Sequence, residues 1–447
     1  MGEVTLLIYA ATAMALGLKA RARTLEKFIL GDTLGTRAMV ATIVSTFYGA
    51  SAILGGVSLT YQVGLGAIWF MVPFYLGNVA MVLLLGRIAR SRSYTLPHFL
   101  GGFYGREFAV ASSVLLATLC LVPEEIIAGG KILALFTSMP VEAAMGVMAC
   151  VLIVPVVLGG MKADVMTDIT QFVLMLLMLG VVIPPVLGLW LDLGAAGPEE
   201  SVVIPAEYFN PCAYMSGQEI GVLFVLLFFL PLTSAPLYQR FFASESEACS
   251  RKSVLYSIVT WMAIDAVVIL CGLAALRRFP HLDDPDLALI MLGEALSPLG
   301  RAVFFVGLLA AIMSTVNSFL QSGAASLAYD VFRHFRPATG PERLLALSRV
   351  FVVVLGGVSL LLALWFQMIV PALLFTLSMW TAGTLVPILA ALTGRRLRKS
   401  TALYSLLSGA GSSLIWKMWQ PFELDALFVG LGFSLLVALL LEIVQNQ

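Results

Sequence analysis

The sequence predicts an all-α polytopic membrane protein with about 13 transmembrane helices. Of its 447 residues, 60% are hydrophobic and 12% are charged, and the mean hydropathy of +0.98 is far above that of water-soluble chains. Apolar runs of about 18 or more residues, enough to cross ~30 Å of hydrocarbon, recur along the whole chain. No long polar stretch separates them, so we expect one transmembrane transporter domain over residues 1–447.

The apolar runs can be placed in order. They lie near residues 3–19, 38–60, 67–88, 108–136, 140–160, 165–192, 218–239, 253–276, 300–327, 345–366, 369–393, 401–419 and 424–443. The first run has neither a basic segment before it nor a clear cleavage site, which favours a retained helix over a signal peptide.

Basic residues are distributed unequally between the two sets of loops. With the N-terminus outside, 21 of the 26 lysines and arginines fall in cytoplasmic loops, among them Arg240, Arg251 and Lys252 after the seventh run. The positive-inside rule therefore predicts an integral protein of the plasma (inner) membrane, with its N-terminus outside and its C-terminus in the cytoplasm. The formal net charge is zero and implies no nucleic-acid partner; the sequence does not indicate an oligomeric state.

A stripe of small and hydroxyl side chains follows one face of the ninth run. Its members recur at spacings of three, four and seven residues: Ala311, Ser314, Thr315, Ser318, Ser322 and Ser326. Such a stripe indicates either close packing of helices through small residues or a row of oxygens for a hard cation.

Two runs carry residues that interrupt helices. The run 38–60 contains Gly49 with polar neighbours, and in the run 218–239 Pro231 and Pro236 flank Thr233 and Ser234. Glycine lets a backbone unwind and proline removes a donor, so in lipid such breaks persist where they line a cavity. Each break opens a set of five runs, 38–192 and 218–393, which indicates an inverted-repeat transporter. Ordinary kinks are the alternative.

Several stretches together resemble the sodium/solute symporter family, which includes sodium/proline, sodium/pantothenate, sodium/sialic acid and sodium/glucose symporters. They read FILGDTLGTRAMVATIVSTFYGASAILGGVSLTYQVGLGAIW (29–69), YTLPHFLGGFYG (94–105), GGMKADVMTDITQF (159–172), YQRFFASESEACSRKS (238–253), AAIMSTVNSFLQSGAASLAYDVF (310–332) and MWTAGTLVPILAAL (379–392). The resemblance implies a LeuT-like core of two inverted five-helix repeats, with a leading helix at 3–19 and two extra helices at 401–443.

The resemblance also implies sodium as the co-transported ion. The matching positions of the common sodium site are Ser45 and Tyr48, through backbone carbonyls, and Ala311, Ser314 and Thr315. These supply about five oxygens without a fixed charge, as a small hard cation prefers. Some members carry a second sodium, whose candidate residues here are Asp168 with Ser314, Asn317 and Ser318. Asp168 is alternatively a helix N-terminal acid, a role that fits Asp164 better.

Candidate solute-binding residues follow from family position and from charge. Those near the family's pocket are Ser51, Trp69, Phe70, Thr233, Ser234 and Trp380. The run 108–136 contains Glu124, Glu125 and Lys131. They either pair with each other or with a neighbouring helix, or Lys131 or Glu125 faces the central cavity and binds a carboxylate or an amine. The stretch SAILGG lacks the amide and carboxylate side chains expected for several sugar hydroxyls, which favours a small carboxylate or amino acid with Lys131 as counter-charge.

We therefore predict a sodium-coupled secondary symporter that imports a small organic solute by alternating access. A proton-coupled symporter and a non-transporting membrane sensor or receptor on the same fold are the alternatives. An enzyme is disfavoured, because the sequence shows no intramembrane cluster of His, Glu and Asp with catalytic spacing and so no candidate catalytic residues.

Overall fold

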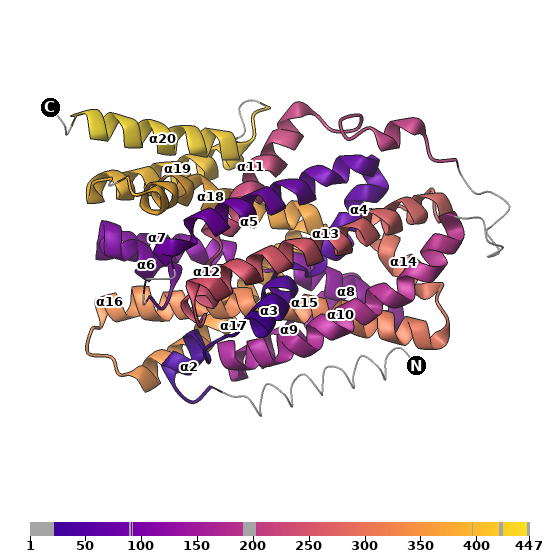
Figure 1. Cartoon of the computed structure of the whole chain (residues 1–447), viewed down its shortest axis with the longest axis horizontal. Helices are drawn as coiled ribbons and strands as arrows, with labels where there is room; N and C mark the ends of the chain where they lie inside the picture. Colours follow the sequence, from indigo (N-terminus) through magenta and orange to yellow (C-terminus); the bar gives the residue numbers. More distant parts are fainter. Residues whose placement is uncertain are drawn as a thin grey trace.

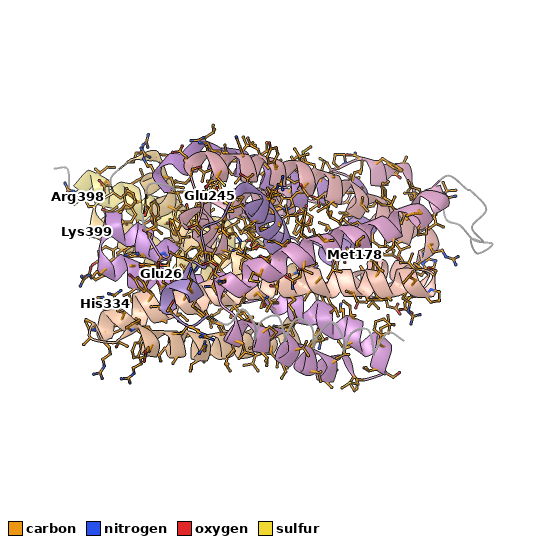
Figure 2. The ribbon with its side chains drawn as sticks, turned by 60° about the horizontal axis from the view of Figure 1, so that its bottom comes forward. Glu26, Met178, Glu245, His334, Arg398 and Lys399 are labelled. Carbon is orange, nitrogen blue, oxygen red and sulfur yellow. The ribbon has the colours of Figure 1, made fainter. Side chains whose placement is uncertain are left out.

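The computed structural model describes residues 22–88, 91, 93–190, 203–395, 397–419 and 423–444. Within these residues the chain is helical, and the only β-pairing is an isolated bridge between Leu34 and Ser244. The longer helices lie side by side along one direction (Figure 1). Charged side chains mark an end of this bundle, where His334, Arg398 and Lys399 lie (Figure 2). The expected leading helix at 3–19 falls outside the described residues.

The first half of the chain contains the first broken helix and the helices that pack around it. Its elements are α2 (Leu25–Ile29), α3 (Thr36–Phe47), α4 (Ala50–Val63), η1 (Gly64–Ala67), α5 (Ile68–Ile88), α6 (Leu96–Tyr104), α7 (Arg106–Leu119), α8 (Pro123–Thr137), α9 (Val141–Leu158) and α10 (Met161–Trp190).

The second half contains the second broken helix and the long central helix. Its elements are η2 (Ala206–Phe209), α11 (Gly217–Thr233), α12 (Ala235–Phe242), α13 (Glu247–Arg278), η3 (Pro285–Leu287), α14 (Ala288–Glu294), α15 (Pro298–Ser326), η4 (Leu327–Phe332), α16 (Arg333–Phe335), α17 (Pro341–Phe366), α18 (Ile369–Thr393), α19 (Lys399–Trp419) and α20 (Ala426–Val444). Serine caps start three of its long helices: Ser216 before α11, Ser246 before α13 and Ser297 before α15.

Ten helical stretches in the described residues are long and apolar enough to cross a membrane. They agree with the expected spans except at three places. The run 3–19 is outside the described residues. The run 38–60 divides at its break into α3 and α4, and α4 is joined to α5 through η1 in one helical stretch, Ala50–Ile88, in which Gly64 has a positive φ of 59°. The run 401–419 forms α19, whose serines and glycines make it less apolar than the others.

The expected single span at 108–136 is in fact interrupted. Helix α7 ends at Leu119 and α8 begins at Pro123, because proline cannot donate the hydrogen bond that would continue α7. The amide left at Val122 donates to Ser359 Oγ of α17 at 3.0 Å, so the break has a partner inside the protein.

Helix α15 lies at the centre of the bundle. Every residue from Gly307 to Ser326 is buried, and α15 packs against α3, α9, α10 and α17 (Figure 1). This accounts for its stripe of small residues, since bulky side chains would keep the neighbouring helices apart. Two hydroxyls of the stripe also form hydrogen bonds to neighbouring helices. Ser322 Oγ donates to Gln239 Oε1 of α12 at 2.5 Å, and Ser326 Oγ donates to Ser113 Oγ of α7 at 3.0 Å.

The packing of α5 on α11 gives a test of the fold. A β-carbon on Gly77 would collide with the backbone carbonyl of Phe228, so Gly77→Ala must push the two helices apart. We expect a loss of about 1–3 kcal/mol, measured as the free energy of unfolding of the purified protein. The control is Gly180→Ala in α10, where nothing lies within 4 Å and helix propensity favours alanine by about 1 kcal/mol. Equal effects of the two substitutions would contradict this packing.

Candidate functional site

The first broken helix forms the centre of the site. Helix α3 ends at Phe47 and α4 begins at Ala50, so Tyr48 and Gly49 have left the helical conformation. The last carbonyls of α3 and the first amides of α4 therefore lack partners within their helices. The sequence prediction of a break at this position is confirmed, and the break exposes backbone oxygens and amide groups in the middle of the bundle.

Glu125 closes the N-terminal end of α4. Its two carboxylate oxygens accept from the backbone amide of Ala50 at 2.8 and 3.0 Å, although Glu125 belongs to α8. A carboxylate is favourable at a helix N-terminus, where the unpaired amides carry partial positive charge. A β-carbon on Gly49 would collide with both Glu125 Oε1 and Thr315 Oγ1. Glycine at this position thus lets α4, α8 and α15 meet at one point.

The five residues of the expected common sodium site lie around this point. Thr315 and Ser314 are buried on α15, one turn from Ala311, whose carbonyl lies 3.5 Å from Thr315 Oγ1. Tyr48 is the C-cap residue that directly follows α3, and Ser45 lies in the last turn of that helix. The Ser45 hydroxyl donates to the Ala41 carbonyl at 2.8 Å. The Ser45 carbonyl is among the last of α3, whose partners within the helix the break removes.

A buried charge cluster lies next to Ser314. Asp168 of α10 is 0% exposed; its Oδ1 accepts from Ser314 Oγ at 2.5 Å, and its Oδ2 accepts from Thr42 Oγ1. One turn earlier, Asp164 Oδ2 accepts from Ser318 Oγ at 2.9 Å. The second-sodium candidates Asp168, Ser314 and Ser318 are therefore brought together, and Asp164 joins them.

Arg240 completes this cluster, contrary to the sequence prediction. It was expected in a cytoplasmic loop, but α12 continues to Phe242 and Arg240 is only 1% exposed. Its Nη2 lies 3.1 Å from Asp164 Oδ2, 3.4 Å from Asp168 Oδ2 and 2.7 Å from Ser318 Oγ. The prediction was wrong because the loop was assigned from the end of the apolar run at residue 239. The flanking stretch LYQRFF, with apolar residues on both sides of Arg240, was the available signal.

Two oxygens of this region have no partner among the described residues. They are Asp164 Oδ1 and Asn317 Oδ1, and both residues line a small cavity that Thr167 also lines. Asn317 is the one amide among the predicted residues of the second sodium site, which otherwise carry a carboxylate or hydroxyl groups. Its orientation leaves an amide oxygen, which is a ligand for hard cations, at the edge of the charge cluster.

The second broken helix also agrees with the sequence prediction. Helix α11 ends at Thr233 and α12 begins at Ala235, with Ser234 in an extended conformation between them. The Thr233 carbonyl accepts from Trp380 Nε1 of α18 at 3.0 Å. The Ser234 hydroxyl is buried and has no partner among the described residues.

A cavity opens beside the first break. It contains about 690 Å³ of space not occupied by atoms, including any part open to solvent, and Ser51 and Phe70 of the predicted pocket line it. Sequence reasoning did not place Glu124 or Asp265 here, but both line the cavity and are 4% and 5% exposed. Their position as charges inside apolar runs was the only signal in the sequence.

The other predicted pocket residues have different surroundings. Lys131 Nζ lies 2.7 Å from Asp284 Oδ2 and 2.8 Å from Asp286 Oδ2, so it pairs with the segment before α14 and not with Glu124. Trp69 Nε1 donates to the Pro211 carbonyl at 3.0 Å. Neither residue is among those that line the cavity, and Glu125 faces the break instead.

Comparison with known proteins gives concordant results. A family model described as the sodium:solute symporter family matches residues 28–409. The chain is 24% identical to the sodium/pantothenate symporter of Escherichia coli, over 98% of this chain and 94% of the relative. It is also 24% identical to the high-affinity proline transporter PutP of Bacillus subtilis, over 86% of this chain and 85% of the relative.

Two solved structures share the fold. A substrate-bound, outward-open Na⁺-coupled sialic acid symporter superposes with a TM-score of 0.76 at 15% identity, over 98% of this chain and 96% of the other. Mhp1, a nucleobase-cation-symport-1 family transporter in a closed conformation, superposes with a TM-score of 0.56 at 15% identity, over 95% and 92%. The expected LeuT-like fold is thereby confirmed.

The Arg240 cluster gives the second prediction. Arg240→Met leaves two carboxylates buried without their cation, and we expect a loss of about 3–5 kcal/mol in the free energy of unfolding. Adding Asp164→Asn should recover part of that loss. The control is Lys162→Met, because Lys162 pairs with Asp32 in an exposed bridge of 3.0 Å worth at most about 1 kcal/mol. Similar losses for Arg240→Met and Lys162→Met would contradict a buried ion cluster.

Proposed function

The chain belongs to the sodium:solute symporter family, and we propose that it imports a small organic solute together with sodium by alternating access. The observation that supports this best is the meeting of Thr315, Ser314 and the break at Tyr48 and Gly49. A broken helix end facing a pair of hydroxyls presents several oxygens to one small volume, as a sodium ion requires.

In this proposal sodium binds the carbonyls of Ser45, Tyr48 and Ala311 and the hydroxyls of Ser314 and Thr315. The ion bridges α3 and α15, which are separate elements of the fold. Bound sodium therefore favours the conformation in which those helices are in contact, and by linkage it raises the affinity for a solute that needs the same conformation. The sodium gradient then drives uptake.

We extend the proposal to a second sodium at Asp168, Ser314, Asn317 and Ser318. With Asp164 and Asp168 ionised and Arg240 charged, the cluster carries one excess negative charge, which one monovalent cation neutralises. The unpartnered oxygens of Asp164 and Asn317 are further ligands for it. A proton can balance the same charge, so proton coupling is the second candidate function.

The proposed orientation keeps the N-terminus outside and the C-terminus in the cytoplasm. Removing buried Arg240 from the cytoplasmic loops leaves 20 of 26 basic residues on that side, so the bias remains large. The solute is proposed to bind in the cavity beside the first break, near Ser51 and Phe70. A carboxylate bound by Lys131 loses its support, because that ammonium is already paired with Asp284 and Asp286.

The third prediction concerns sodium dependence. Ser314→Ala and Thr315→Ala each remove an ion ligand, and we expect the sodium concentration for half-maximal uptake by proteoliposomes to rise about 10-fold or more. The control is Ser348→Ala, whose buried hydroxyl donates only within α17, to the Leu344 carbonyl at 2.9 Å. Uptake driven equally well by an acid outer buffer without sodium would favour proton coupling. Solute binding without flux would indicate a sensor or receptor.

The fourth prediction concerns the second sodium. If two ions bind, the sodium dependence of uptake has a Hill coefficient between about 1 and 2, and Asp168→Asn lowers it to about 1. Thr315→Ala is the matched comparison, since Thr315 belongs to the common site alone and should weaken sodium binding without removing the second ion. A wild-type Hill coefficient of 1, with one sodium per solute in flux measurements, would contradict the second site.

A further inference from the structure

We infer that the solute is a small organic cation, an amine or quaternary ammonium, bound between Glu124, Asp265 and the aromatic wall of the central cavity. This inference rests on the proposed function, because it names the solute of the same transport site. It departs from the carboxylate or amino acid that the sequence favoured.

Glu124 provides the first anionic group. It lies in the first turn of α8, is 96% buried and lines the cavity, and its Oε2 has no hydrogen-bond partner among the described residues. An unpaired carboxylate in an apolar site is strongly unfavourable, so its partner is either a proton or a ligand. A cationic head group in the cavity would satisfy it.

Asp265 of α13 provides the second anionic group. It lines the same cavity, and its Oδ2 accepts from the Tyr75 hydroxyl of α5. Tyr48 is a second hydrogen-bond partner of this carboxylate. Both tyrosines are neutral donors, so they leave the charge of Asp265 uncompensated. The two carboxylates come from different helices, α8 and α13, and so delimit the cavity from separate directions.

No basic side chain lines the cavity in the described part of the chain. The buried basic side chains of the described residues already have carboxylate partners. Lys131 pairs with Asp284 and Asp286, and Arg240 pairs with Asp164 and Asp168. Glu124 and Asp265 therefore have no protein cation. A solute carboxylate would meet two like charges instead of a counter-charge, which is unfavourable in a low-dielectric site.

The usual backbone site for an anion is also occupied. The N-terminus of α4 faces the break, and a helix N-terminus ordinarily attracts a carboxylate. Here both oxygens of Glu125 accept from the Ala50 amide, so the protein supplies that anion itself. A solute carboxylate would have to displace a buried side chain that has no other partner to move to.

Aromatic rings line much of the remaining surface. Phe47, Tyr48, Phe70, Phe74 and Phe319 all face the cavity. Tyr48 stacks on Trp261 with centroids 6.1 Å apart and an interplanar angle of 11°, and Phe74 packs on the same indole at 4.8 Å. Stacked aromatic faces stabilise ammonium groups through cation–π interactions and fit the apolar part of such a solute. Sugars and multivalent anions find few suitable partners in this wall.

The test is a binding screen on the purified full-length protein in sodium buffer, by thermal shift and isothermal titration. The cationic probes are ethanolamine, choline and putrescine. The matched probes are 3,3-dimethylbutan-1-ol, the neutral isostere of choline, and the carboxylate-bearing glycine betaine and proline. We expect at least one cation to stabilise the protein and bind, and the neutral isostere and the carboxylates to bind at least about 10-fold more weakly.

Substitutions then locate the site. Glu124→Gln and Asp265→Asn keep the shape of each side chain and remove its charge, and each should weaken binding of the cation about 10-fold or more. The control is Glu142→Gln, which removes an exposed carboxylate from the first turn of α9. Should either cavity variant fail to fold, the comparison of choline with its neutral isostere on the unaltered chain still decides the question.

Failure of this inference can be told apart from failure of the proposed function. If sodium stabilises the protein and none of the cationic probes does, or if proline or betaine binds better than all of them, the inference is wrong and symport stands. If sodium produces neither stabilisation nor gradient-driven uptake of any probe, the proposed sodium coupling is wrong.

Discussion

The central constraint on this fold is that a broken helix inside a bilayer must find partners for its backbone within the protein. The break after Tyr48 meets this requirement through Glu125, which reaches from α8 to the first amides of α4. Gly49 makes the approach possible, and Thr315 of the central helix α15 occupies the remaining side. Three helices distant in sequence are thus held at one point, and the oxygens of the proposed sodium site are arranged around that point.

Two sets of buried charges in the described residues have different meanings. Lys131 and Arg240 each pair with two carboxylates, and such pairs hold elements together, since removing one partner leaves a charge stranded. Glu124 and Asp265 lack a cation of the protein, and both line a cavity. A charge that the fold does not neutralise is expensive to keep, so its position is the most informative one for what the protein binds.

The sequence predicted the helical class and both helix breaks, because glycine and proline act locally on a membrane helix. The residues of the common ion site came from the family resemblance and stay a prediction. It misplaced Arg240 and could not assign a partner to Lys131. Hydropathy ended the seventh run just before Arg240, and the partners of Lys131 lie about 155 residues away, in a loop segment that packs inward. Such pairings depend on how helices come together, which no local pattern records. Glu124 and Asp265 were visible as charges, but not as neighbours of one cavity.

The adjacency of Glu124 and Glu125 gives the two proposed sites a physical link. Both residues lie in the first turn of α8, immediately after the interruption at residues 120–122, yet Glu125 faces the break and Glu124 faces the cavity. In the proposed mechanism, a sodium ion near Glu125 and an organic cation near Glu124 would repel each other, and ionised carboxylates at both positions would offset that repulsion. Each cation therefore requires that the start of α8 stay docked against α4. In the proposed mechanism, the single turn of helix that begins at Pro123 would make the occupancy of either site depend on the other, because a shift of that turn would remove both carboxylates together.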